Sequence, residues 1–436
     1  MNARALDTAF RIGARLARDA VWHEDRCNWF SPVYENFTGQ QQLATGTLGP
    51  TLYDGTAGIA LFLAHLHRQT GDGLFAGTAE AAIEHAIARR IDIPESLQLG
   101  FYTGYLGIGY AAAEVGRCLD DAALVKRGLS LIRHTLAIDP AGKIELDVMS
   151  GRAGAIPALL RLHAIHGGDD LFDAARAAGE LLLDRAVRDD RGLSWDTMGE
   201  MARGIDLSSV SEALAEAYGA DDRPRLTGLS HGAGGIGWAL TELAAATGDT
   251  RFGAAAREAF AYEDSSFDGE TDRWPDLRHK ATGQPPGPPP AAWCHGAVGI
   301  GLARLRAFEI TGDPAYREAV QNALRITARS VIGQLAAGTG NFSLCHGLAG
   351  NAELFLLWHQ ITGDPEARQL ADAIAEAGID GHDAPGRPWP SGIEGGGEAP
   401  SLMLGLAGTG YFYLRIAEPR TPSVVLVTPR DGKPPP

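Results

Sequence analysis

The sequence predicts an all-α protein, an α/α toroid of seven helical hairpins arranged in two concentric layers. A Gly-x-x-Gly pair recurs seven times along the 436 residues. Each pair opens an apolar stretch, and a more polar, amphipathic stretch follows it. The first and last units are as apolar as the middle ones, so an open row of hairpins would expose apolar ends. Closure into a ring removes those ends and is therefore the predicted arrangement.

The glycine pairs mark where each unit begins. Their shortest spacing is roughly fifty residues, and two longer intervals indicate insertions into one repeated unit. Each pair occupies a turn that requires unusual backbone angles or close backbone approach. The pairs are Gly55–Gly58, Gly104–Gly107, Gly151–Gly154, Gly232–Gly235, Gly296–Gly299, Gly347–Gly350 and Gly405–Gly408.

The stretch after each pair predicts a buried helix, and the next stretch predicts an outer helix. IALFLAHLHRQ at 59–69 is apolar nearly all round, which is typical of a helix enclosed on most sides. A stop such as ITGDP at 310–314 follows, where Gly supplies a left-handed cap and Asp can cap the next helix. In one of the following stretches, a single apolar stripe is formed by Val125, Leu129, Ile132 and Leu136.

Closure of the ring would place all seven glycine turns at one end, around a common axis. The positive ends of the helix dipoles would then point to that mouth and favour anions. We expect a helical lead-in over 1–45, the toroid over 46–420 and a tail over 421–436 that is disordered at its PRDGKPPP end. A proline-rich loop at 281–290 is expected to be a rigid spacer or the support of a lid.

Composition narrows the class of protein. The formal net charge of −16 argues against a general nucleic-acid binder and allows attraction to basic peptides. The four cysteines are unevenly spaced, unlike a disulfide framework, and the N-terminal stretch lacks the apolar core of a signal peptide. No apolar run approaches the ~20 residues that a membrane helix needs. We therefore expect a cytoplasmic protein without a transmembrane segment.

Candidate metal ligands stand directly before three neighbouring glycine pairs. The residues before the seven pairs are Tyr53–Asp54, Tyr102–Thr103, Met149–Ser150, Ser230–His231, Cys294–His295, Cys345–His346 and Met403–Leu404. Two cysteines and up to three histidines can therefore converge, and thiolate with imidazole suits Zn²⁺. Three protein ligands leave one coordination position open, which is typical of a catalytic zinc site.

The residues alone leave several roles open. Cys294, Cys345 and His346 are the expected ligands of a metal ion, whereas His295 is a ligand, an outer hydrogen-bond donor or a substrate contact. Asp147 is either a turn-capping residue or a functional carboxylate. Two glutamates in the Gly- and Pro-rich loop near the last turn are either an acid–base pair or a solvated loop, Glu394 and Glu398. The two remaining cysteines lie outside the turns and are expected to be small core residues, Cys27 and Cys118.

These motifs resemble the lanthionine synthetase C-like (LanC-like) family. Three stretches are most similar in sequence to the cyclase half of class II (LanM-type) lanthipeptide synthetases. They are LYDGTAGIALFLAHL at 52–66, WCHGAVGIGLARL at 293–305 and CHGLAGNAELF at 345–355. The resemblance covers the chain from about Leu52 to Leu414 and implies the same α/α toroid. It also implies one zinc ion held by Cys294, Cys345 and His346, a catalytic histidine at His231 and a catalytic aspartate at Asp147.

The implied activity is that of a zinc-dependent lanthipeptide cyclase. A peptide cysteine thiol, activated by the metal, adds to dehydroalanine or dehydrobutyrine and forms a lanthionine or methyllanthionine thioether ring. His231 would protonate Cα, Asp147 would accept the thiol proton or orient its neighbours, and His295 would contact the substrate. The implied partners are a dehydrated precursor peptide and a separate dehydratase, because no kinase-like dehydratase domain precedes the toroid.

Two positions depart from the family, and three alternatives remain. His295 stands where some members have Tyr, and Pro290 stands where stand-alone cyclases have Arg. The first alternative is addition of glutathione or another thiol to dehydrated residues in proteins. The second is a two-carboxylate glycosidase on a helical toroid, which would leave Cys294 and Cys345 without a role. The third is a peptide-binding scaffold without catalysis.

Overall fold

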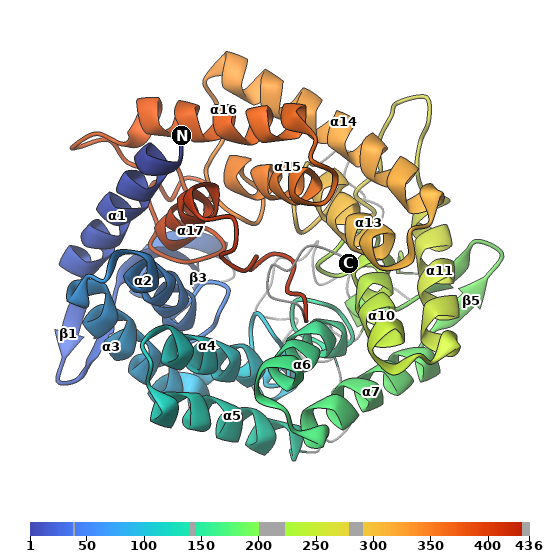
Figure 1. Cartoon of the computed structure of the whole chain (residues 1–436), viewed down its shortest axis with the longest axis horizontal. Coiled ribbons are helices and arrows are strands. Elements are labelled where there is room, and N and C mark those ends of the chain that lie inside the picture. The colour runs from blue at the N-terminus through green and yellow to red at the C-terminus, as the bar shows by residue number, and fades with distance from the viewer. Residues whose placement is uncertain (38–39, 139–144, 200–222, 279–290, 430–436) are drawn as a thin grey trace.

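The computed structural model is a closed ring of helices in two concentric layers (Figure 1), which confirms the predicted α/α toroid. It describes residues 1–37, 40–138, 145–199, 223–278 and 291–429. The inner layer holds α2 (Thr56–Thr70), α4 (Tyr105–Cys118), α6 (Arg152–His166), α10 (Ala233–Thr247), α13 (Ala297–Thr311), α15 (Leu348–Thr362) and α17 (Leu406–Ala417). The outer layer holds α1 (Asn2–Asp19), α3 (Gly73–Arg89), α5 (Ala122–Leu136), α7 (Asp169–Asp184), α11 (Thr250–Asp264), α14 (Pro314–Ala337) and α16 (Pro365–His382).

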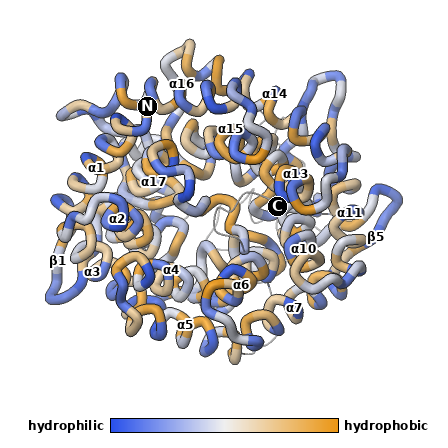
Figure 2. Tube along the Cα trace, viewed as in Figure 1, coloured by the Kyte–Doolittle hydropathy of each residue, from blue (hydrophilic) through white to orange (hydrophobic). Residues whose placement is uncertain are grey.

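The two layers differ in how much of each helix is buried. Every residue of α4 except Arg117 is buried, whereas α5 buries one stripe, Leu124, Gly128, Ile132 and Thr135. This stripe shares Ile132 with the predicted one and otherwise lies one position earlier, because Gly128 has no side chain and allows α4 to approach α5 closely at Gly109. Figure 2 shows the same division, with hydrophobic residues between the layers and hydrophilic residues toward the rim.

The turns between inner and outer helices use the predicted stop signal. Gly71, Gly248, Gly312 and Gly363 each follow an inner helix with φ between 71° and 76°, a left-handed cap that favours glycine. The next residue is an aspartate whose side chain accepts a backbone N–H of the following outer helix, namely Asp72, Asp249, Asp313 and Asp364. The sequence TGD therefore ends one helix and begins the next.

The ring is closed by its two ends. Helix α1 packs against α17, so the seventh hairpin combines the last inner helix with an outer helix from the N-terminus. Thr8 donates to Asp383 at 2.5 Å, and Arg15 pairs with Glu398 at 2.7 Å. The expected helical lead-in is thus part of the ring, and it continues as the antiparallel hairpins β1 (Val21–His23) with β2 (Arg26–Asn28) and β3 (Phe30–Phe37) with β4 (Gln40–Thr47). A third hairpin pairs β5 (Val187–Asp189) with β6 (Gly192–Ser194).

The segment 421–428, expected to belong to a tail, lies inside the ring. Its apolar residues Val424, Val425, Leu426 and Val427 are buried, and Figure 1 shows the chain running from α17 to the centre of the ring. The sequence SVVLV thus gains the burial of four apolar side chains by entering the axis. The predictions for the proline-rich loop at 281–290, for Pro290 and for the end of the tail at 430–436 lie outside the described residues.

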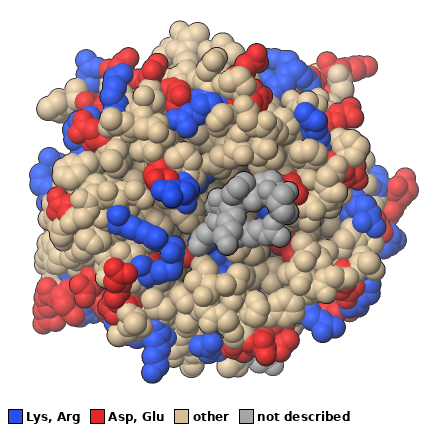
Figure 3. All heavy atoms as spheres, in the orientation of Figure 1, with Lys and Arg blue, Asp and Glu red and all other residues tan. Residues whose placement is uncertain are grey.

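Charged side chains of both signs are interspersed on the face shown in Figure 3, without one extended field of a single sign. Among the helices that the structure describes, none has the length and apolar character needed to cross a membrane.

Candidate metal and catalytic site

The turns before the inner helices are joined to one another in a closed ring of backbone hydrogen bonds. The residue two positions before each first glycine donates its N–H to the carbonyl of the equivalent residue in the next turn, at N···O distances from 2.9 to 3.4 Å. The order is Tyr53, Tyr102, Met149, Ser230, Cys294, Cys345, Met403 and back to Tyr53. The side chains at these positions are therefore held at one level around a common axis.

The second glycine of each pair permits this arrangement. A Cβ atom at Gly107 would lie 1.7 Å from the carbonyl oxygen of Phe101, and one at Gly350 would lie 2.0 Å from that of Leu344. Real Cβ atoms do not approach backbone oxygen so closely, so only glycine lets the inner helix press against its own preceding turn. The Gly-x-x-Gly repeat thus encodes the packing that positions the site.

One turn differs in its backbone. Gly296 has φ of 99°, whereas the equivalent Gly347 has φ of −118°. Only glycine adopts the first conformation readily. The histidines before these glycines differ as well, because His295 is 4% exposed whereas His346 is on the surface of the site. The two Cys-His sequences are therefore identical, but one histidine is buried and the other is exposed.

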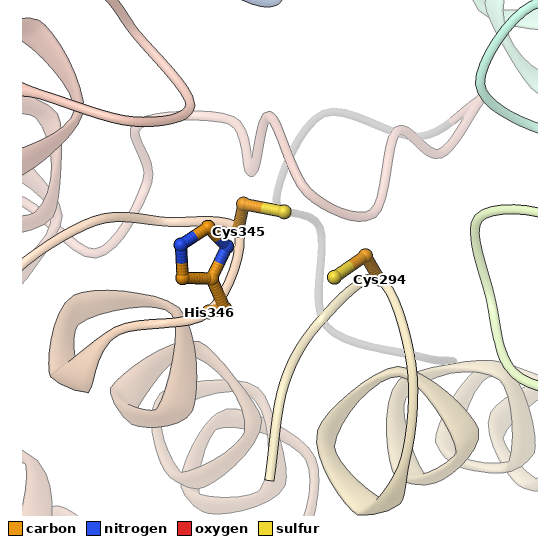
Figure 4. A group of neighbouring side chains, drawn as sticks. All are labelled: Cys294, Cys345 and His346. Atoms are coloured by element: carbon orange, nitrogen blue, oxygen red, sulfur yellow. The ribbon is translucent and has the colours of Figure 1, made fainter. Parts of the chain in front are cut away.

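Three donor atoms converge at the axis, one from each of Cys294, Cys345 and His346. All three lie within 4.8 Å of one another. Figure 4 shows the two sulfur atoms facing each other and one ring nitrogen of His346 turned toward them. The helices that follow these residues, α13 and α15, are neighbours in the ring. Two sulfurs and one imidazole nitrogen form a donor set that suits zinc, so the three residues could hold a metal ion.

The three donor groups also interact with one another. Cys294 accepts a hydrogen bond from Cys345, which holds the pKa of Cys294 well below its usual range and raises that of Cys345. The contact with Cys294 also raises the pKa of His346. The Nε2 of His346 lies 2.8 Å from the carbonyl oxygen of Gly392. This contact requires the proton on Nε2 and leaves Nδ1 as the free acceptor, the arrangement common to metal-binding histidines.

A histidine–aspartate pair lies beside the three donors. Asp147 Oδ2 is 2.5 Å from Nδ1 of His231, and Asp147 Oδ1 accepts the backbone N–H of Ser150 at 2.7 Å. Asp147 therefore caps its turn with one oxygen, as one of the two predictions had it, and holds the histidine with the other. The carboxylate is 1% exposed and the His231 side chain is 16% exposed, and Nε2 is the ring nitrogen that does not contact Asp147.

His295 is brought next to this pair and is separate from the three donors. The ring centres of His231 and His295 are 5.7 Å apart. Burial, and then the charge of Arg278, lowers the pKa of His295 to about 4. His295 is therefore a neutral imidazole, able to donate or accept one hydrogen bond without adding charge.

Two further residues, Tyr53 and Arg278, reach the site, although the sequence analysis did not predict them as site residues. The Tyr53 hydroxyl is hydrogen-bonded to Cys345, and burial, followed by the two nearby thiol groups, raises the pKa of Tyr53. Arg278 is held by Asp276 at 2.6 Å, and its charge acts on His295. Tyr53 occupies the same turn position as the cysteines, which is the signal that could have identified it. No motif in the sequence marks Arg278.

The remaining candidate residues lie elsewhere. Glu398 accepts the backbone N–H of Trp389 at 2.9 Å and pairs with Arg15, so it stabilises its loop. The carbonyl of Glu394 accepts the hydroxyl of Tyr34 at 2.8 Å. Cys27 and Cys118 are buried, and burial raises their thiol pKa values to about 12 and about 11. They are the small core residues that were expected.

Comparison with known proteins identifies what this arrangement is similar to. A family model described as "Lanthionine synthetase C-like protein" matches residues 46–427. The protein "Glutathione S-transferase LANCL1" of Danio rerio is 24% identical over 387 residues, covering 85% of this chain and 82% of that protein.

Two solved structures give the fold. "Nisin cyclase" superposes with a TM-score of 0.59 at 17% identity, over 85% of this chain and 89% of that chain. An "unsaturated glucuronyl hydrolase specific for heparin" superposes less well, with a TM-score of 0.42 at 17% identity over 74% and 82%. The second likeness is too low to bear on function, and the first supports the α/α toroid.

Proposed function

This chain belongs to the lanthionine synthetase C-like family, and we propose that it is a zinc-dependent lanthipeptide cyclase. The observation that carries the proposal is the convergence of Cys294, Cys345 and His346 beside the His231–Asp147 pair. The proposed substrate is a dehydrated precursor peptide, which a separate dehydratase would supply. The reaction adds a cysteine thiol of that peptide to dehydroalanine or dehydrobutyrine and closes a thioether ring.

In this proposal the chain supplies three ligands and leaves room for the substrate sulfur. Cys294, Cys345 and His346 would hold one zinc ion, and the closed hydrogen-bond ring of the turns would fix their positions. When bound, zinc lowers the pKa of a coordinated thiol, so that the sulfur reacts as a thiolate at neutral pH. The hydroxyl of Tyr53 donates to the Cys345 sulfur, which moderates the negative charge gathered on the two cysteines.

His231 would complete the addition by moving a proton. Attack of the sulfur on the β-carbon places negative charge on Cα and its carbonyl, and the product needs a proton at Cα. Asp147 holds Nδ1 of His231, so Nε2 is the atom that would donate that proton. The buried carboxylate stabilises the protonated ring before transfer and keeps it oriented. His295, neutral beside it, is positioned to contact the peptide through one hydrogen bond.

A second candidate is thiol addition to dehydrated residues with glutathione as the thiol. The observation that favours it is the name of the Danio rerio relative, a glutathione S-transferase. The same ligands and the same proton donor would serve, because the chemistry at the sulfur and at Cα is identical. The two candidates differ only in whether the attacking thiol belongs to the peptide.

The test uses a dehydrated precursor peptide that contains cysteine. Ring closure does not change the mass, so it is followed by loss of thiol alkylation and by fragmentation. Wild type should close rings faster than Cys294→Ala, while Cys27→Ala, which changes a core cysteine, should match wild type. Glutathione adducts in place of rings would favour the second candidate. Equal rates for wild type and Cys294→Ala, with no adduct formed, would exclude catalysis and leave a peptide-binding scaffold.

A further inference from the structure

The segment 421–428 is hydrogen-bonded to the ring along its length. At its start, the Tyr411 hydroxyl donates to the carbonyl of Pro422 at 2.9 Å. Near its middle, Ser423 accepts the N–H of Leu426 and forms a local turn. At its end, Arg161 donates to the carbonyl of Thr428 at 3.3 Å. The segment is therefore an integral part of the interior, and side chains of several inner helices hold it by hydrogen bonds.

The middle of this segment touches the turns that carry the site. The Tyr102 hydroxyl donates to the carbonyl of Val424 at 2.7 Å, and the Trp293 indole N–H donates to that of Val425 at 2.8 Å. The Tyr102 and Trp293 rings meet edge to face with their centres 5.0 Å apart. Both side chains come from the glycine turns, so the segment contacts the hydrogen-bonded ring from within.

Trp293 connects the segment to both proposed sulfur ligands. It directly precedes Cys294 in the chain, and its backbone N–H donates to the carbonyl of Cys345 at 2.8 Å. Its side chain is fully buried and has one polar atom, the indole nitrogen, which is bonded to Val425. The indole N–H therefore keeps its hydrogen bond in only one orientation of the ring, and this orientation also fixes the backbone of residue 293.

We propose that the segment 421–428 is a positioning element of the metal site, which acts through Trp293 on Cys294 and Cys345. The inference rests on the proposed zinc site. Without the Val425 contact, the indole loses its hydrogen bond and the carbonyl is left unpaired in the interior, so residue 293 is free to shift. The two sulfur atoms then lose the spacing that three-donor binding requires. Trp293 is thus a positioning residue and touches no substrate.

The test compares Trp293→Phe with a matched substitution away from the site. Trp29 is also buried, and its indole N–H also donates to a backbone carbonyl at 2.8 Å, that of Leu16 in outer helix α1. Trp29→Phe therefore removes the same kind of bond. Zinc affinity is measured by competition with a chelator, and the ligand geometry by the absorption spectrum of the Co²⁺-loaded protein. Trp293→Phe should bind zinc on the order of 10-fold more weakly with an altered Co²⁺ spectrum, and Trp29→Phe should match wild type.

The outcomes separate this inference from the proposed function. If wild type binds no zinc, the proposed function is wrong. If wild type binds zinc and the two tryptophan variants bind it equally well, the inference is wrong and the function stands. Should Trp293→Phe fail to fold by circular dichroism, Tyr102→Phe carries the test, because it removes the Val424 contact from the same segment. Its control is Tyr413→Phe, whose hydroxyl donates to Ala375 at 2.9 Å. Tyr102→Phe should weaken zinc binding several-fold, and an affinity equal to that of Tyr413→Phe would overturn the inference.

Discussion

Replacing Gly350 by Ala tests how closely helix α15 packs against the turn that carries Cys345. The added Cβ would lie 2.0 Å from the carbonyl oxygen of Leu344 and 2.8 Å from its carbonyl carbon. Both atoms belong to the backbone directly before Cys345, so no side chain can rotate away. Relief requires a backbone shift of about 1 Å, and overpacking of this kind costs about 3 kcal/mol. For 436 residues unfolding in one transition, this lowers the melting temperature by about 3 °C.

The matched control is Gly333→Ala in outer helix α14, where an added Cβ meets nothing within 4 Å. Alanine is favoured over glycine in a helix by about 1 kcal/mol, so this variant should melt slightly higher than wild type. Melting is followed by circular dichroism, and zinc content by elemental analysis of the same samples. Gly350→Ala should also lose zinc, because Leu344 and Cys345 move together. An unchanged melting temperature with full zinc content would refute the account of the glycine turns.

Three further outcomes are expected. Cys345→Ala should reduce the zinc content from about one ion per chain toward none, whereas Cys27→Ala should retain it, and full zinc in Cys345→Ala would exclude the site. His231→Ala should keep its zinc and lose on the order of 10²-fold or more in the rate of ring formation; loss of zinc instead would make His231 a ligand. Burial lowers the pKa of His65 to about 4, so only the unfolded chain takes up this proton as the pH falls below about 6.5. Between pH 7.5 and 5.5, the free energy of unfolding of wild type should therefore fall by about 1 kcal/mol more than that of His65→Gln, as measured by denaturant unfolding. An equal fall in both proteins would contradict the lowered pKa of His65.

The fold could be predicted because one rule repeats. Each of the seven Gly-x-x-Gly pairs, with the apolar stretch after it, predicts the same local geometry, and a TGD stop follows four of these stretches. The grouping of Cys294, Cys345 and His346 could be predicted for the same reason, since the repeats that carry them are neighbours and the two cysteines occupy equivalent positions. The pairing of Asp147 with His231 confirms that these two turns meet, although the sequence alone left Asp147 ambiguous.

The remaining features depend on contacts between distant segments. His295 and His346 follow equivalent cysteines, but the positive φ of Gly296 makes them different, and a glycine can adopt either sign without any mark in the sequence. The segment SVVLV was placed in a tail because its partners, Tyr102 and Trp293, are far away along the chain. Tyr53 occupies the same turn position as Cys345, but it comes from the other end of the chain, so its contact with Cys345 depends on closure of the ring.

The pairing of α1 with α17 has a consequence for how the protein is made. Thr8 of α1 and Asp383 at the end of α16, which are hydrogen-bonded where the ring closes, are 375 residues apart. At a synthesis rate of about 5–20 residues per second, the N-terminal helix leaves the ribosome about 20–75 s before its partner exists. During that time α1 can already contact α2 and α3, which are made soon after it, but its contact with α17 cannot form. The ring is therefore expected to close only when synthesis is nearly complete, and a circular permutant that makes α1 follow α17 would turn this long-range contact into a local one.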